Sequence, residues 1–374
     1  MPQPSAAVAL RALLRRPEIH AVPGCFDALS ARLIERAGFP LAYMDGFAVT
    51  LARLGLPDAG LISYGEIVDQ GRDVCAAVTI PVIGDGGCGH GGAMNVKRTV
   101  DGYAAAGFAA IVIGDRSTAR VDGGGPAKGV IDRDDALVRV AAACDARDEG
   151  SGIVVVARTD AGAGGDLDEA LWRAQAFADQ GADIIFLGTP CAGKDLERFC
   201  AQVAVPKMLV LGAHDEATLD RLQAVGIRLA VDPLTPMTAA AGAMEGALVA
   251  LRERRPVIGA IEASRLSDIA GLPRHIEIET GYGVDDGRRV RRPVAIPAPR
   301  DRSFRPRAGG ENGAPKSSPG HWIVGAMFVL IGVFSLHMAS QAEDRVTYLG
   351  GIAFFVATVL FIFWLIHKVT GEKT

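Results

Sequence analysis

The sequence predicts an α/β fold: a (β/α)₈ barrel of the TIM type, followed by a linker and two transmembrane helices. Three observations support this prediction. Eight short apolar runs alternate with helical patterns over about the first 255 of the 374 residues. Several of the helical patterns end in glycine, and two long apolar runs lie near the C-terminus. Strand–helix alternation is the pattern of a sheet covered by helices, and long apolar runs are typical of membrane spans.

The eight apolar runs are the expected strands. They are continuously apolar rather than alternating, as is typical of parallel strands that are buried on both faces. Eight alternations favour a closed barrel, and an open doubly wound sheet is the alternative. The runs cover residues 20–22, 41–44, 81–83, 110–113, 153–156, 183–187, 207–210 and 227–231.

Helical patterns fill the intervals between these runs, at 28–37, 64–77, 95–106, 134–145, 167–180 and 216–225. Gly38, Gly107, Gly181 and Gly226 follow four of them, and glycine readily adopts the left-handed conformation that closes a helix. An apolar run from Ala6 to Leu14 contains and precedes arginines, so we interpret it as an amphipathic first helix and not as a signal peptide. The barrel is therefore expected to occupy residues 1–255.

The C-terminal third differs in kind from the barrel. Residues 256–280 are expected to be helical, and residues 281–320, rich in Gly, Pro, Arg, Asp and Ser, are expected to form a flexible linker. Two apolar runs, 322–339 and 346–366, each approach the roughly 20 residues that span a bilayer. They predict a transmembrane hairpin over residues 321–369. A pair of buried core helices is the alternative, but such helices normally keep a polar stripe.

The charges that flank the predicted hairpin indicate its orientation. The short loop between the spans is acidic on balance, whereas the outer flanks are basic. Because basic flanks tend to stay in the cytoplasm, the protein is expected to be membrane-anchored, with the barrel on the cytoplasmic side. The basic residues are Arg291, Arg292, Arg300, Arg302, Arg305, Arg307, Lys368 and Lys373.

Composition excludes several classes of partner. The net charge of -4 is small for this length, so no nucleic-acid partner is expected. The glycine-rich segment 86–92 lacks the spacing of a nucleotide-binding loop. The six cysteines are scattered and form no CxxC pair, which favours a reducing compartment.

The candidate site lies where the predicted strands end, because barrels of this kind carry function at the carboxyl ends of their strands. Several carboxylates and one arginine follow the apolar runs, which indicates a small anionic ligand with a hard metal ion. The alternative is that these aspartates and glycines are ordinary turn residues. The residues in question are Pro23, Gly24, Asp45, Gly46, Asp85, Gly114, Asp115, Arg158, Thr159, Asp160, Gly188, Gly212, Asp232 and Pro233.

Five segments, in order along the chain, resemble the isocitrate lyase/phosphoenolpyruvate mutase superfamily. They are PGCFDALSA at 23–31, LGLPD at 54–58, PVIGD at 81–85 with NVKRTV at 95–100, ARTDA at 157–161 and GADIIF at 181–186. The resemblance covers roughly residues 20–245. It implies a barrel that binds Mg²⁺ at its strand ends. It also implies a lyase or mutase that cleaves or forms C–C or P–C bonds in small 2-oxo or 2-hydroxy carboxylates, through an enolate-type intermediate.

The resemblance also implies roles for particular residues. Arg158 would bind a substrate carboxylate, and Asp58 and Asp85 would belong to the Mg²⁺ shell; these three are the catalytic candidates. The substrate-binding set would comprise Tyr43, Asp45, the backbone N–H groups of Gly46 and Phe47, and Arg158. Because family members exchange a C-terminal helix when they assemble, residues 256–280 are expected to serve a homo-oligomer.

The departures from the family pattern are also informative. Glycine stands at Gly87, Gly114 and Gly188, where the family has acids. The family's loop with a catalytic cysteine has no counterpart, and residues 120–126 stand in its place. Asp45 replaces a serine, and its charge would repel an anionic substrate unless it were protonated. Each lost carboxylate weakens cation binding, so the Mg²⁺ site is expected to be weakened or lost.

Two hypotheses of function follow. The first is an active lyase or mutase of altered chemistry. The second is a catalytically degenerate, membrane-tethered barrel that acts as a binding or scaffold module. A further hypothesis concerns Cys88 and His90, which would bind zinc or act as nucleophile and base. The alternative, that both belong to a flexible loop without chemistry, is favoured because no second ligand cluster is visible.

Overall fold

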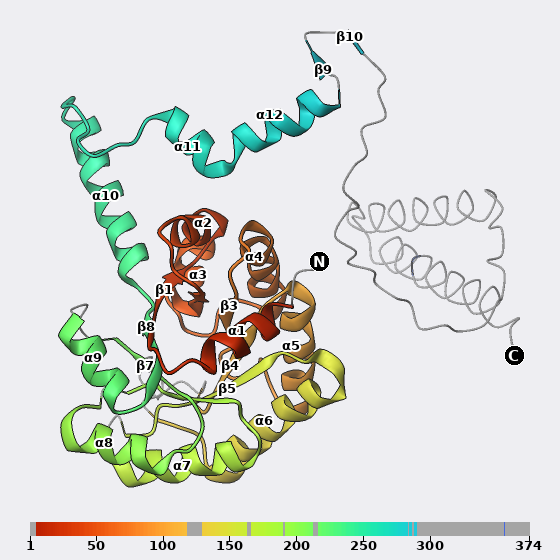
Figure 1. Cartoon of the computed structure of the whole chain (residues 1–374), viewed down its shortest axis with the longest axis vertical. Helices are drawn as coiled ribbons and strands as arrows, with labels where there is room; N and C mark the ends of the chain where they lie inside the picture. The colour runs from red at the N-terminus through yellow and green to blue at the C-terminus, as the bar shows by residue number, and fades with distance from the viewer. Residues whose placement is uncertain are drawn as a thin grey trace, which may run out of the picture. The chain divides into compact units, whose positions relative to one another are not determined.

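The computed structural model describes residues 5–117, 129–162, 166–189, 191–211 and 216–282, together with 284–285, 288–289 and Phe355. In this part of the chain, eight parallel strands form a closed barrel in sequence order, and the last strand pairs with the first (Figure 1). The predicted barrel is therefore confirmed, and the open doubly wound sheet is excluded.

All eight apolar runs are strands, and some ladders extend beyond the predicted ends. Gly24 pairs with Tyr43, and Gly114 pairs with Arg158, so the first, fourth and fifth strands carry polar or glycine residues near their carboxyl ends. The strands are β1 (His20–Cys25), β2 (Ala42–Met44), β3 (Val82–Asp85), β4 (Ala110–Gly114), β5 (Val154–Thr159), β6 (Ile184–Leu187), β7 (Lys207–Val210) and β8 (Ile227–Asp232).

The predicted helices are present, and α1 has the predicted bounds. Three helices were not among the predicted helical patterns: α3 after β2, α8 after β6 and α10 after β8. The helices around the barrel are α1 (Ala6–Leu14), α2 (Ala28–Arg36), α3 (Gly46–Leu54), α4 (Tyr64–Ala77), α5 (Ala93–Ala106), α6 (Arg133–Ala146), the π-helical turn η1 (Arg147–Ser151), α7 (Leu167–Asp179), α8 (Gly193–Gln202), α9 (Glu216–Ala224) and α10 (Thr235–Arg252).

Alternate residues of each strand fill the inside of the barrel. Val154 and Val156 of β5 point inward, for example, and Tyr43 of β2 meets Phe186 of β6 edge-to-face at 6.5 Å between ring centroids. Leu10 of α1 belongs to the same buried cluster, and Arg11 donates a hydrogen bond to the Gly152 carbonyl just before β5. Helix α1 therefore closes the amino-terminal end of the barrel, which leaves the carboxyl end open for a ligand.

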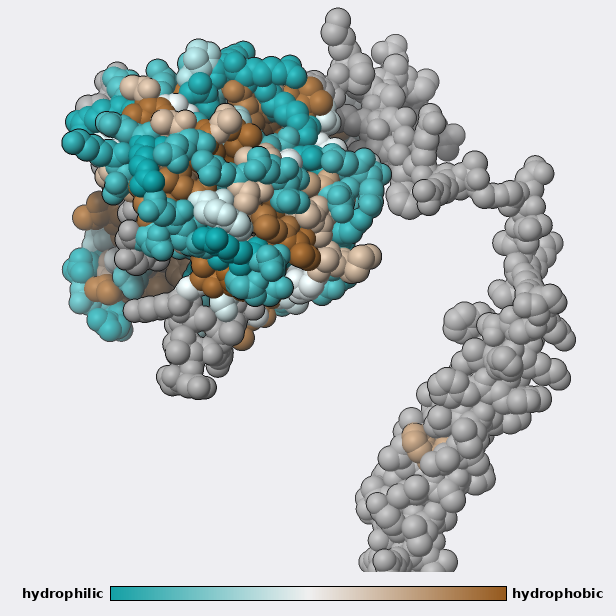
Figure 2. All heavy atoms as spheres, turned by 90° about the horizontal axis from the view of Figure 1, so that it is seen from below, coloured by the Kyte–Doolittle hydropathy of each residue, from teal (hydrophilic) through white to brown (hydrophobic). Residues whose placement is uncertain are grey.

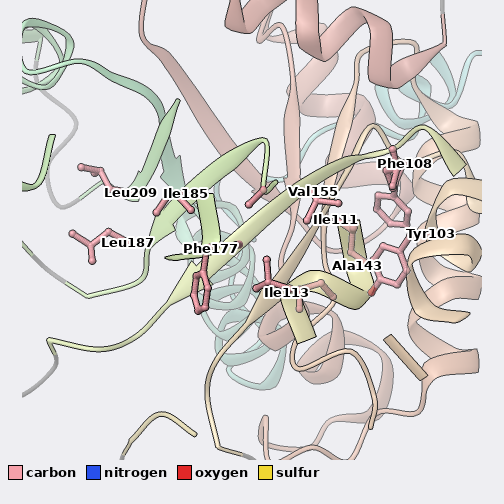
Figure 3. Close-up of a cluster of buried hydrophobic side chains, with 14 of the residues drawn as sticks. Tyr103, Phe108, Ile111, Ile113, Ala143, Val155, Phe177, Ile185, Leu187 and Leu209 are labelled. Carbon is pink, nitrogen blue, oxygen red and sulfur yellow. The ribbon is translucent and has the colours of Figure 1, made fainter. Parts of the chain in front are cut away.

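The other face of each strand packs against the surrounding helices (Figure 3). Tyr103 of α5 stacks on Phe108 at 4.7 Å and donates a hydrogen bond to the Asp85 carbonyl at 2.6 Å. A Cβ atom at Gly84 would lie only 2.6 Å from the Phe108 ring, so glycine is required there. Burying each such side chain contributes roughly 1.5–3 kcal/mol. This packing fixes the end of β3, where Asp85 lies.

Beyond the barrel, residues 256–280 are largely helical, as expected. They contain α11 (Ala263–Ala270) and α12 (Leu272–Gly281), and α11 contacts α2 through an Arg36–Asp268 ion pair of 2.7 Å. The segment predicted as a linker without regular structure is corrected in one place. Val284–Asp285 (β9) and Arg288–Arg289 (β10) pair as short antiparallel strands, because hydrogen bonding between adjacent segments needs no apolar period.

Apart from Phe355, the predicted hairpin at 321–369 lies outside the described residues, as does most of the predicted linker. Among the helices that the structure does describe, none is both long and apolar enough to cross a bilayer. Figure 2 shows one face of the molecule, on which hydrophilic residues predominate and apolar residues occur in small groups.

Candidate active site

A pocket of about 160 Å³ opens at the carboxyl ends of the strands. The structure brings together six of the seven residues that the sequence predicted for the site, and Gly46 lies directly between two of them. The lining residues are Tyr43, Asp45, Phe47, Asp58, Asp85, Arg116, Arg158, Phe186, Val210, Pro233 and Leu234.

The alternation along the strands explains why these residues meet. The uppermost inward-facing side chain of most strands is apolar and buried, and the next inward position lies two residues further on. Those next positions form one layer at the mouth of the barrel. The layer consists of Gly24, Asp45, Asp85, Gly114, Arg158, Gly188, Val210 and Pro233, in strand order.

Asp45 begins α3 and places the start of that helix at the pocket. Its carboxylate accepts a hydrogen bond from the Ala48 N–H at 2.8 Å, which makes it the N-cap of the helix. Within the described part of the chain, the N–H groups of Gly46 and Phe47 have no acceptor. Unpaired N–H groups at a helix N-terminus attract anions. The backbone N–H groups that were predicted to bind a substrate carboxylate therefore belong to the first turn of α3.

Three carboxylates on this side of the pocket repel one another. Burial, and then the charge of Asp85, raise the pKa of Asp45 to about 7. The same two causes raise the pKa of Asp58, which lies on the exposed loop between α3 and α4. Asp85 is half-buried and accepts a hydrogen bond from the Gly87 N–H at 2.9 Å. At neutral pH Asp45 is thus partly protonated, which reduces its repulsion of an anion.

Tyr43 presents a buried hydroxyl group without a hydrogen bond of normal geometry in the described structure. Burial, and then the nearby Asp85, raise its pKa well above the usual value, so the hydroxyl keeps its proton. An unsatisfied buried donor costs free energy. A ligand oxygen in the pocket would supply the missing acceptor.

Arg158 is held in one orientation on the opposite side. Its guanidinium forms two parallel hydrogen bonds with Asp160, at 3.0 Å from Nε and 2.8 Å from Nη2. Its carbon Cζ lies 5.0 Å from the centre of the Phe186 ring. Burial lowers the pKa of Arg158, but the hydrogen bonds and charge of Asp160, together with Tyr43 and Asp85, raise it more, so the residue stays charged. Arg158 therefore offers a fixed positive charge to the cavity.

Asp115, one of the acidic residues that follow the predicted strands, does not line the pocket. It is buried and paired with Arg173 at 3.2 Å, and it accepts hydrogen bonds from the Thr159 hydroxyl and the Asp160 N–H. Burial raises its pKa, and these hydrogen bonds oppose the shift. Asp115 therefore supports the end of β5 from behind.

The three glycines that replace family acids differ in their surroundings. Gly87 is exposed and has a φ of 57°, a backbone conformation that favours glycine. A Cβ atom at Gly114 would make only ordinary contacts, 3.5 Å from the Gly87 carbonyl oxygen. A Cβ atom at Gly188 would lie 2.7 Å from the Arg158 Nε and would collide with the Asp160 carboxylate. Of these three positions, only Gly188 has the space for a side chain occupied by a neighbouring ion pair.

Cys88 and His90 do not line the pocket. His90 packs edge-to-face against Tyr64 at 5.8 Å, and its carbonyl accepts a hydrogen bond from Asn95. No group of three His, Cys, Asp or Glu side chains in the described structure is placed to hold a metal ion. The hypothesis of a zinc site on this loop therefore gains no support.

Four lining residues were not predicted: Arg116, Phe186, Val210 and Leu234. Phe186 and Val210 have the inward parity of their strands, so the alternation of buried positions was a usable signal. Arg116 and Leu234 lie beyond the ends of β4 and β8, where no periodic pattern indicates direction. The segment 120–126, which replaces the family's cysteine loop, lies outside the described residues, as does Gly212.

The fold and the pocket define a class: a (β/α)₈ barrel with a small polar pocket at the carboxyl ends of its strands. The family described as phosphoenolpyruvate phosphomutase matches residues 10–252. The chain therefore belongs to the phosphoenolpyruvate mutase/isocitrate lyase superfamily.

Named relatives extend this comparison. The chain is 30% identical over 285 residues to 2,3-dimethylmalate lyase from Eubacterium barkeri, covering 74% of this chain and 98% of the relative. Among solved structures, it resembles oxaloacetate acetylhydrolase in complex with the product oxalate, with a TM-score of 0.69 at 30% identity over 75% of this chain and 98% of the other. It also resembles phosphonopyruvate hydrolase in complex with oxalate and Mg²⁺, with a TM-score of 0.67 at 27% identity over 75% and 99%.

Proposed function

We propose that this protein is a lyase of the superfamily that binds a small 2-oxo or 2-hydroxy carboxylate and cleaves or forms a C–C or P–C bond in it. One observation carries the proposal: a fixed arginine, an unsatisfied buried hydroxyl and the open N-terminus of α3 all border one pocket. The relatives that match nearly their whole length are named for reactions of such carboxylates.

Each of these groups has a part in binding the substrate. Arg158 binds the carboxylate next to the oxo or hydroxy carbon, because a guanidinium pairs with a carboxylate through two N–H groups. The N–H groups of Gly46 and Phe47 stabilise negative charge on the substrate. Tyr43, kept protonated by burial, donates a hydrogen bond to an oxygen that becomes negative in the transition state.

The residues present fit a weakly held Mg²⁺. Burial and the charge of Asp85 raise the pKa of Asp58, and a divalent cation bound by these two carboxylates would relieve the repulsion. Mg²⁺ needs only one or two protein carboxylates when water and the substrate complete its shell. When bound, Mg²⁺ would polarise the substrate's oxygen atoms. Because Gly87, Gly114 and Gly188 supply no further carboxylate, we propose that this protein binds Mg²⁺ more weakly than its relatives do.

A turnover assay tests the proposed activity. The full-length protein is incubated with Mg²⁺ and with oxaloacetate, 2,3-dimethylmalate or phosphonopyruvate, and the products are followed by NMR. We expect turnover of at least one compound and its loss in an Arg158→Lys variant prepared in the same way. Binding of oxalate without any turnover would instead favour the binding or scaffold module, and the absence of both would refute the proposal.

We also propose that the protein forms a homo-oligomer through residues 256–280. Large apolar side chains of this segment are exposed in the single chain: Ile258 (95%), Leu272 (48%) and Ile276 (52%). Exposed apolar side chains on a helical segment are typical of surfaces that bind another protein. Light scattering of the purified chain should give a mass of two or more copies, which Leu272→Glu with Ile276→Glu should reduce. A monomeric wild-type protein would contradict this proposal.

We further propose a membrane anchor at residues 321–369 that leaves the barrel on the cytoplasmic side. The support is the length and apolarity of the two runs and their basic flanks. The full chain should pellet with membranes and resist carbonate extraction, whereas a chain that ends near Pro315 should stay soluble. Release of the full chain by carbonate would refute the anchor.

A further inference from the structure

We propose that Asp160 is the residue that positions Arg158 for substrate binding, and that Gly188 is required because it leaves room for the Asp160 carboxylate. Asp160 lies directly after β5, and Gly188 lies directly after the neighbouring strand β6. This inference rests on the proposed function, in which Arg158 binds the substrate carboxylate.

The contacts leave Arg158 one orientation. Asp160 pairs with Nε and Nη2 along one edge of the guanidinium, and Phe186 lies against it. The two charged side chains are 20% and 16% exposed, so solvent screens the pair only weakly. Among the described residues, Nη1 makes no hydrogen bond, and Arg158 lines the pocket. The guanidinium is therefore fixed on one edge and available to a ligand on another.

Space at Gly188 decides whether this pair can form. The backbone of Gly188 is held to β5 by a hydrogen bond from its N–H to the Thr159 carbonyl at 2.9 Å. Its φ is not in the left-handed region, so the backbone itself does not require glycine. A Cβ atom would nevertheless collide with the Asp160 carboxylate and lie 2.7 Å from the Arg158 Nε. Any side chain at this position displaces the ion pair.

Asp160 is itself anchored from behind the pocket. Its N–H donates to the Asp115 carboxylate at 2.9 Å, and the preceding Thr159 hydroxyl donates to the same carboxylate at 2.7 Å. Asp115 is paired with the buried Arg173. The order Arg173, Asp115, Asp160, Arg158 thus connects a buried ion pair to the ligand-binding guanidinium.

Oxalate binding distinguishes positioning from competition. If Asp160 orients Arg158, its loss frees the guanidinium, and the Kd for oxalate should rise about 10-fold to 100-fold, as expected when a binding group loses its orientation. If Asp160 instead competes with the ligand for Arg158, its loss should tighten binding. Isothermal titration of oxalate with Mg²⁺ into the full-length protein measures this difference for the wild type and for Asp160→Asn, which has nearly the same shape.

A rescue variant tests the role of Gly188. Gly188→Ala should weaken oxalate binding to a similar degree as Asp160→Asn, because it displaces the same carboxylate. Combining Asp160→Ala with Gly188→Glu should recover most of the affinity, because it returns an acid to β6 next to Arg158. Asp168→Asn, which removes the exposed partner of Arg198, is the matched control and should leave the affinity unchanged.

A second measurement keeps this inference separate from the proposed function. The ¹H–¹⁵N signal of the Arg158 Nε should be shifted and protected from exchange in the wild type, and should lose both features in Asp160→Asn, without any ligand. Should the wild type fail to bind oxalate, the proposed function fails while this signal still tests the ion pair. An unchanged signal, or unchanged or tighter oxalate binding in Asp160→Asn, would overturn the inference.

Discussion

The two sides of the pocket differ in how their charged side chains are paired. On the side of β2 and β3, Asp45, Asp58 and Asp85 line the cavity and form no ion pair with any residue that the structure describes, and burial and mutual repulsion raise the pKa of Asp45 and Asp58. On the side of β4 to β6, the two described carboxylates next to Arg158 and behind it are paired: Asp160 with Arg158, and Asp115 with Arg173.

This difference shows that the charged groups are distributed unevenly around the pocket. The β2–β3 side keeps negative charge that a cation would stabilise. The β4–β6 side keeps a fixed positive charge that an anion would stabilise. A substrate carboxylate should therefore bind toward Arg158, and a metal ion toward Asp85.

The largest effect is expected where the β4–β6 side depends on a buried ion pair. Arg173→Met leaves the Asp115 charge buried and unpaired, which should destabilise the fold by about 3–5 kcal/mol. Arg198→Met breaks an exposed pair with Asp168 and should cost less than about 1 kcal/mol. Urea unfolding of both variants measures the contrast, and equal losses would show that the Asp115 pair is not special.

The next largest effect is expected on ligand binding at the β4–β6 side of the pocket. Arg158→Lys keeps the charge but loses the two-pronged geometry, so the Kd for oxalate should rise roughly 100-fold. Arg116→Lys, at an exposed lining position, should change it by less than about 5-fold. Titration calorimetry gives both values. A larger effect at Arg116 would move the anion site away from β5.

Two glycine substitutions in the same layer sharpen the comparison further. Gly188→Ala forces the Arg158–Asp160 pair to move and should cost about 1–3 kcal/mol. Gly114→Ala meets only ordinary contacts and should stay within about 0.5 kcal/mol of the wild type. Thermal unfolding should separate the two variants, and similar melting temperatures would mean that the pair adapts without cost.

The smallest effect is a pH dependence from the β2–β3 side. The pKa of Asp45 is raised in the folded state, so its contribution to stability is fully present below about pH 4 and is lost as pH rises toward 7. Asp45→Asn keeps the N-cap and removes the charge. With a chelator present, it should stabilise the fold at pH 8, where the buried wild-type carboxylate is charged, and have little effect at pH 4. A pH-independent difference would contradict the shift.

Much of the fold and the site followed from sequence patterns. The eight apolar runs predicted the eight strands, because a short strand that is buried on both faces is apolar at nearly every position. The rule that sites lie at strand ends brought Asp85 and Arg158 to one pocket. Helix α3 was not predicted, because the chain after β2 shows no clear amphipathic period, although its first two residues were recognised as N–H donors.

The pairing of Arg158 with Asp160 could have been predicted from the sequence, but it was not predicted. Arg158 lies near the end of β5 and Asp160 follows two residues later, directly after the strand, yet only the structure shows that Gly188 leaves the space for their contact. Likewise, Asp115 follows a strand as the site residues do, but its odd parity relative to Val112 points it away from the pocket. A residue that lies an even number of positions from the inward-facing residues of its strand belongs to the site, and one at an odd number supports it from behind. This alternation separates the two groups better than position at the strand end does.

The central claim is that a cation on the Asp85 side and an anion on the Arg158 side bind together, and titration of oxalate with and without Mg²⁺ tests it most directly. In the wild type, Mg²⁺ should tighten oxalate binding at least about 10-fold, because each ligand stabilises the other. In Asp85→Asn this dependence should vanish while weak, Mg²⁺-independent binding remains. Oxalate affinity that is the same with and without Mg²⁺ in the wild type would contradict the claim.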